Sequence, residues 1–83
     1  MQPKIENHLS GKRLLITGAS GYLASNLVDL IKDISCIICR LSRGRELPPL
    51  QGVALYEDFY GDIQEPSVWE RAMKEVDVVF HFA

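Results

Sequence analysis

The sequence predicts an α/β fold in which helices cover a parallel β-sheet. Three observations lead to this prediction: apolar runs as short as buried strands, amphipathic segments with helical spacing, and an alternation of the two along the chain. Of the 83 residues, 47% are hydrophobic and 24% are charged, which is the composition of a globular domain. This length allows one small domain or a piece of a larger one.

The first half of the chain predicts a strand, a helix and a second strand. Residues 12–17 form a short apolar burst that ends at Gly18, as a buried strand does. After Gly21 the apolar period becomes helical, because Leu23, Leu27, Leu30 and Ile31 fall at i, i+4, i+7 and i+8. Residues 35–41 are rich in Ile and Cys and predict the second buried strand.

The second half predicts a loop, a strand, a helix and a last strand. Residues 42–50 are charged and contain a Pro-Pro pair, so we expect a loop, with a short helix near 43–47. Residues 53–56 predict the third strand. Pro66 suits the first turn of a helix whose apolar face carries Trp69, Met73 and Val76. Residues 76–83 predict the fourth strand.

This order indicates an incomplete domain. A parallel sheet needs cover on both faces, and two helices cover little more than one. The sequence also stops in an apolar strand. We therefore expect residues 1–11 to be an N-terminal arm and residues 12–83 to be the first part of a larger domain. As a free polypeptide, the chain would expose the apolar strand 76–83 and tend to associate.

Charge and hydropathy exclude several classes of protein. The net charge of −2 gives no basic surface, so we expect no binding to nucleic acid. No apolar run approaches the roughly 20 residues that span a bilayer, and the first residues do not resemble a secretory signal. We therefore expect a cytoplasmic protein that does not bind membranes.

Cys36 and Cys39 form a Cys-x-x-Cys pair within a predicted strand. Residues three apart on a strand point to opposite faces, and neither His8 nor His81 has a paired spacing that completes a zinc site. We expect two reduced core cysteines and no metal site.

The segment most informative about function lies between the first predicted strand and the first predicted helix. It reads Thr17-Gly18-Ala19-Ser20-Gly21-Tyr22-Leu23-Ala24. Glycines let a backbone approach a ligand closely, and a helix start offers free N–H groups to a pyrophosphate. Ala24 is small enough for the helix to pack tightly on the strand. The glycines alone also fit a plain tight turn; the flanking strand and helix favour nucleotide binding.

This segment resembles the TGxxGxxG/A motif of the short-chain dehydrogenase/reductase superfamily. Gly61-Asp62-Ile63 and the strand 76–83 resemble motifs of its extended branch, the nucleotide-sugar epimerases and dehydratases. The resemblance implies a Rossmann-like, doubly wound parallel sheet, of which this chain holds the N-terminal strands and helices. It also implies a nicotinamide dinucleotide site. The implied contacts are Gly18, Ser20, Gly21, Tyr22 and Leu23 at the pyrophosphate, Asp62 and Ile63 at the adenine, and Phe82 and Ala83 beside the nicotinamide-side ribose and phosphates.

The second strand suggests which dinucleotide is bound. An acidic residue about 20 positions beyond the glycine turn binds the ribose 2′-OH of NAD, and residues 39–43 contain none. Arg40, with help from Ser42 and Arg43, would instead clamp a 2′-phosphate. We expect NADP in preference to NAD, and Arg40→Asp to shift the affinity ratio toward NAD. The alternative is that Arg40 and Arg43 are solvated loop cations.

No catalytic residue is expected within this chain. Proton transfer in the superfamily is carried by a Tyr-x-x-x-Lys pair, and none of Tyr22, Tyr56 and Tyr60 has a lysine four residues later. The resemblance implies the cofactor-binding part of a nucleotide-sugar epimerase, dehydratase or reductase, whose full-length form is a possible homodimer. Two alternatives remain: a non-catalytic module that senses NADP, and a truncated fragment without activity of its own.

Overall fold

The protein is described by a computed structural model that covers residues 8–44 and 46–82. Four strands form one parallel sheet in the order β3-β2-β1-β4. The strands are β1 (Arg13–Thr17), β2 (Ile37–Ser42), β3 (Leu55–Tyr60) and β4 (Val78–His81). Helix α2 (Tyr22–Ile31) connects β1 to β2, and helix α3 (Pro66–Met73) connects β3 to β4. The expected incomplete Rossmann-like α/β architecture is confirmed.

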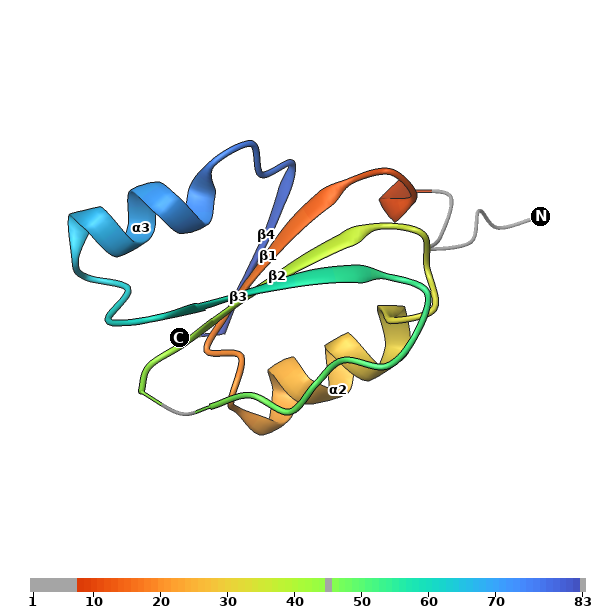
Figure 1. The fold of residues 1–83 in the computed structure, drawn as a ribbon, viewed down its shortest axis with the longest axis horizontal. Coiled ribbons are helices and arrows are strands. Elements are labelled where there is room, and N and C mark those ends of the chain that lie inside the picture. Colours follow the sequence, from red (N-terminus) through yellow and green to blue (C-terminus); the bar gives the residue numbers. More distant parts are fainter. Residues whose placement is uncertain (1–7, 45, 83) are drawn as a thin grey trace.

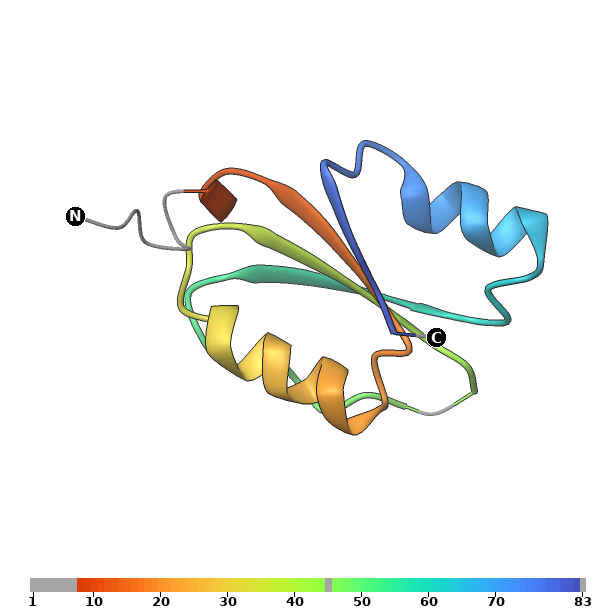
Figure 2. The same ribbon diagram turned by 180° about the vertical axis from the view of Figure 1, so that it is seen from behind.

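The two helices lie on opposite faces of the sheet (Figures 1 and 2). One core cluster joins α2 to the sheet residues Leu14, Ile16 and Ile38. A second cluster joins α3 to Leu15 and Cys39. Helices α2 and α3 therefore cover opposite faces of the sheet rather than the same face.

The connection from β2 to β3 contributes to the core without forming a helix. Its described residues form bends and irregular chain, so the short helix expected near 43–47 is absent from them. Leu47 and Ala54 are buried against the α2 side of the sheet. The Leu47 N–H donates a hydrogen bond of 3.2 Å to the Tyr60 hydroxyl, and the Ala54 N–H donates one of 2.8 Å to the Lys32 carbonyl. Both bonds hold this irregular chain beside α2, and Figure 1 shows this segment in green.

The buried face of α2 agrees in part with the predicted stripe, because Ile31 is buried and Leu27 packs against the core. Ala24, Val28 and Ile31 face the sheet, whereas Leu23 and Leu30 are 66% and 78% exposed. The fully buried Ala24 lets the helix start come close to the sheet, as expected, and this close approach turns Leu23 outward.

The third strand runs over 55–60 rather than 53–56. Its central residues Glu57 and Asp58 suggest a loop in the sequence, but each pairs with an arginine of another strand. Glu57 lies 3.2 Å from Arg13, and Asp58 lies 2.7 Å from Arg40. Ion pairs across the sheet therefore allow charged residues inside the ladder.

At the N-terminus, the last residues of the expected arm pack on the domain. Leu9 is buried in the α2-side cluster, and the Gly11 N–H donates a hydrogen bond of 2.8 Å to the Ser35 carbonyl. Residues 1–7 lie outside the described residues. Within the described chain, no helix has the length and apolar character needed to cross a membrane.

Candidate dinucleotide site

The turn after β1 brings backbone to the carboxyl edge of the sheet. Gly18 has φ +64°, a conformation that favours glycine, and its carbonyl accepts a hydrogen bond of 2.9 Å from the Gly21 N–H. A Cβ on Gly21 would lie 3.2 Å from that carbonyl oxygen. The Ala19 N–H donates a hydrogen bond to the Leu41 carbonyl, which fixes the turn against β2. The turn is thus tight and has little room for side chains.

Helix α2 starts at this turn without a side-chain cap. Gly21 is the N-cap residue, and the first turn contains no acidic residue. The Tyr22 and Leu23 side chains are exposed, and their backbone N–H groups belong to the first turn of the helix. Because the first N–H groups of a helix have no partner within the helix, this start can accept an anion.

The end of β2 supplies a buried hydroxyl and an exposed cation. Ser42 is fully buried, and among the described residues its Oγ is the one buried side-chain N or O atom without a hydrogen-bond partner. Arg43 follows it, and its side chain is 83% exposed. An unpaired buried hydroxyl costs stability unless a ligand or water completes it. Because Ser42 has no exposed surface, a ligand would reach this hydroxyl only after a local opening of the strand end.

The end of β3 supplies a carboxylate beside that cation. The Asp62 Oδ1 accepts a hydrogen bond of 2.9 Å from the Gln64 N–H, and its Oδ2 lies 3.6 Å from the Arg43 Nη2. Gly61 has φ +150°, and its N–H donates to the Ser42 carbonyl. This bond holds the ends of β2 and β3 together.

The three turns meet in one cavity of about 210 Å³. Its lining residues are Gly18, Leu41, Arg43, Gly61, Asp62, Ile63 and Gln64. Of the residues that the sequence assigned to these parts of the dinucleotide, Gly18, Arg43, Asp62 and Ile63 line this cavity. The others do not line it: Ser20, Gly21, Tyr22, Leu23, Arg40 and Ser42.

Arg40 lies away from this cavity. Its Nε and Nη2 donate hydrogen bonds of 2.7 Å and 2.8 Å to the two Asp58 oxygens, and its guanidinium lies over the Tyr56 ring at 4.8 Å. The side chain is nearly buried on the α2 side of the sheet. The sequence could not reveal Asp58 as the partner, because the pairing depends on the register of β2 and β3.

The end of β4 is tied to β1 by Thr17, the first residue of the glycine motif, to which the sequence analysis assigned no separate role. The Thr17 Oγ1 accepts a hydrogen bond of 3.0 Å from the Phe82 N–H and lies 2.8 Å from the His81 Nδ1. Phe82 follows β4 at the same edge of the sheet. Ala83, the other residue assigned to the nicotinamide side, lies outside the described residues.

The cysteines are free and buried, and they belong to different core clusters on the two faces of the sheet, as expected. Burial raises the pKa of both thiols, which keeps them protonated and unreactive. No group of three His, Cys, Asp or Glu side chains that suits a metal ion occurs among residues 8–44 and 46–82.

Comparison with known proteins identifies the family of this chain. The NAD dependent epimerase/dehydratase family matches residues 14–83. The ketoreductase adrE of Penicillium roqueforti is 29% identical over 84 residues, which cover 88% of this chain and 24% of that protein. The ketoreductase adrE of Penicillium rubens is 28% identical over 91 residues, which cover 94% and 26%.

The chain thus spans about a quarter of the length of these relatives. No solved structure matches it significantly. The family match covers the glycine turn and the ends of β2, β3 and β4, which form the edge described above. This chain belongs to the NAD-dependent epimerase/dehydratase family.

Proposed function

We propose that this chain is the dinucleotide-binding part of an NADP(H)-dependent ketone reductase. The observation that carries the proposal is the cavity in which the turns after β1, β2 and β3 meet beside the uncapped start of α2. A nicotinamide dinucleotide needs a phosphate cradle, a ribose contact and an adenine contact in one cleft, and this edge offers all three.

Each part of the dinucleotide has a proposed contact. The backbone of Gly18, Ser20, Gly21, Tyr22 and Leu23 holds the pyrophosphate at the positive end of α2. Asp62 accepts a hydrogen bond from the adenine amine, and Ile63 packs on the ring. Phe82 and Ala83 line the nicotinamide side, where the bound cofactor supplies or accepts the hydride.

We assign the 2′-phosphate to Arg43 and Ser42. Arg43 is exposed at the rim of the cavity, and Ser42 has a buried hydroxyl in need of a partner. Arg40 is nearly buried, is held by two hydrogen bonds to Asp58 and does not line this cavity. Arg43 is exposed, and its longer ion pair with Asp62, at 3.6 Å, holds it less firmly. This choice supports NADP over NAD.

The substrate is proposed from the relatives. Both are named ketoreductases, which favours reduction of a ketone over the nucleotide-sugar chemistry expected from the sequence. Assays of the purified protein with ketones and with nucleotide sugars would distinguish the two classes. We also propose that the protein is cytoplasmic and that its full-length form is a homodimer.

The assignment is tested by titrating NADPH and NADH into the protein and its Arg43→Gln variant. A charge-assisted hydrogen bond contributes about 1.5–3 kcal/mol, so we expect NADPH affinity to fall about 10-fold to 100-fold and NADH affinity to change little. Arg71→Gln is the matched control, because Arg71 is an exposed arginine on α3 that does not border the cavity. Equal losses for both dinucleotides, or none, would contradict the role of Arg43. Absence of binding to either would refute the proposed function.

A further inference from the structure

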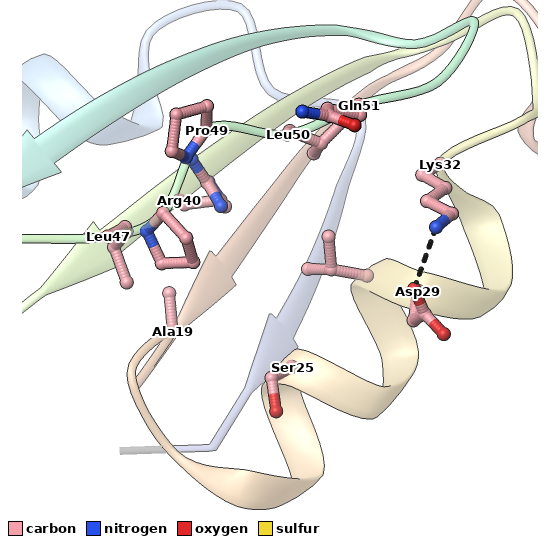
Figure 3. A pocket seen from close by; sticks show the side chains of 11 residues that line it. Ala19, Ser25, Asp29, Lys32, Arg40, Leu47, Pro49, Leu50 and Gln51 are labelled. Atoms are coloured by element: carbon pink, nitrogen blue, oxygen red, sulfur yellow. Dashed lines mark ion pairs between the residues drawn. The ribbon is translucent and has the colours of Figure 1, made fainter.

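A second cavity of about 300 Å³ lies between α2 and the connection from β2 to β3. Figure 3 shows Ser25 and Asp29 on the helix side and Leu47, Pro49 and Leu50 on the connection side. The described part of this connection is not helical, so no helix fills the space beside α2. The cavity borders the glycine turn at Ala19 but shares no lining residue with the strand-end cavity.

Arg40 contributes a fixed cationic group to this cavity. Its side chain is 6% exposed, and two of its three nitrogens that carry protons are held by Asp58. The guanidinium also lies over the Tyr56 ring. A group held on two sides in this way loses little freedom when it binds a ligand.

The third nitrogen, Nη1, is available for a ligand. Within residues 8–44 and 46–82 it has no hydrogen-bond partner. Among the described residues, Ser42 Oγ is the one fully buried side-chain N or O atom without a hydrogen-bond partner. Nη1 also lacks a partner, so it is not fully buried. Nη1 therefore still reaches accessible space, and it offers two N–H donors.

The charges around the cavity favour a neutral ligand. Asp58 compensates the charge of Arg40, and Asp29 lies 2.9 Å from the Lys32 ammonium. An anion would therefore meet the Asp29 carboxylate and two cations that already have a counter-charge. A carbonyl oxygen accepts the Nη1 N–H groups without adding charge, and the apolar residues Leu47 and Leu50 suit a hydrocarbon body.

We propose that this cavity is a second binding site, for a small neutral apolar molecule whose carbonyl oxygen accepts hydrogen bonds from the Arg40 Nη1. The site is separate from the dinucleotide cleft and does not depend on the proposed reductase activity. It also gives Arg40 a ligand contact that leaves the ion pair with Asp58 intact.

Cyclohexanone is a suitable probe, titrated into the protein while the side-chain N–H signals of Arg40 are followed by NMR. We expect a saturable shift of these signals. Ser25→Leu places a larger side chain at the wall without touching the ion pair, and it should weaken binding at least fivefold. Asn26→Leu is the control, because Asn26 is exposed on the same helix and does not border the cavity.

Three results would overturn the proposal. The first is the absence of a saturable shift, and the second is equal binding by the Ser25→Leu and Asn26→Leu variants. The third is tighter binding of cyclohexanecarboxylate than of cyclohexanone, which would refute the charge argument. A parallel NADPH titration keeps this test separate from that of the dinucleotide site.

Discussion

The ion pair between Arg40 and Asp58 should be a major determinant of stability. Asp58→Asn keeps the shape of the side chain but removes its charge and one of the two oxygens that accept hydrogen bonds from Arg40. The guanidinium would stay nearly buried without a counter-charge, because its side chain is 6% exposed. We therefore expect a large loss of stability from a change of very few atoms.

The size of the loss follows from burial. Breaking a buried ion pair at one partner costs about 3–5 kcal/mol, and we take the lower end because the Asp58 side chain is 16% exposed. At about 4–8 °C per kcal/mol for a domain of this size, Tm should fall by about 12–24 °C. Glu57→Gln removes the neighbouring pair with Arg13, in which the Glu57 side chain is 50% exposed, and should cost about 1 kcal/mol or less.

Urea unfolding followed by the fluorescence of Trp69, the single tryptophan, measures both losses. The double variant Arg40→Met with Asp58→Leu replaces the pair by apolar side chains and should recover most of the stability lost in Asp58→Asn. This variant also keeps the test informative if Asp58→Asn does not fold. Equal losses in Asp58→Asn and Glu57→Gln, or no recovery in the double variant, would refute the reasoning.

Two further predictions concern the core and the end of β3. Burial raises the pKa of the Cys39 thiol, so the unfolded chain loses this proton at a lower pH than the folded chain. The free energy of unfolding should therefore be constant below about pH 8.5 and fall above it. Cys39→Ala should reduce that fall, as measured by urea titrations. A fall equally steep in Cys39→Ala would exclude this thiol as a cause. Gly61→Ala should cost about 1–3 kcal/mol, because the new Cβ would lie 2.7 Å from the Val68 Cγ2 at a φ of +150°. Thermal unfolding measures this cost. Gly61→Ala should cost less when it is introduced into the Val68→Ala variant than when it is introduced into the original protein. Unchanged stability in Gly61→Ala would contradict the predicted clash.

The order of strands and helices could be predicted because it depends on local pattern. The glycine turn, the apolar run of 12–17 and the Gly61-Asp62 segment each carry their signal within a few residues. Parallel strands end at a common edge, and the segments after β1 and β3 meet there in the cavity beside Gly18 and Asp62.

Features that depend on packing could not be predicted in the same way. The helical spacing of α2 fits a stripe through Leu23 and Leu30 as well as one through Ala24 and Val28. The sheet selects the second stripe, because the glycine turn brings the helix start so close that only a small side chain fits between them. Hydrophobicity alone favours the wrong face here, since leucine is more apolar than alanine.

Register explains why the arginine proposed for the cofactor changes from Arg40 to Arg43. Arg40 lies 22 positions beyond Gly18 (40 − 18 = 22), close to the spacing of the residue that binds the ribose, and this count suggested its role. However, β2 continues to Ser42, so Arg40 lies opposite Asp58 within the ladder rather than beyond the strand end.

The position that a dinucleotide can reach is set by where the strand ends, and Ser42 ends β2 at 24 positions beyond Gly18 (42 − 18 = 24). The assignment of Arg40 to the 2′-phosphate stays a prediction, which its ion pair with Asp58 opposes. A cofactor preference predicted from the number of residues beyond the glycine turn therefore also requires the register of the neighbouring strand. A charged residue inside the ladder forms an ion pair with its cross-strand partner, and a ligand would have to compete with that pair.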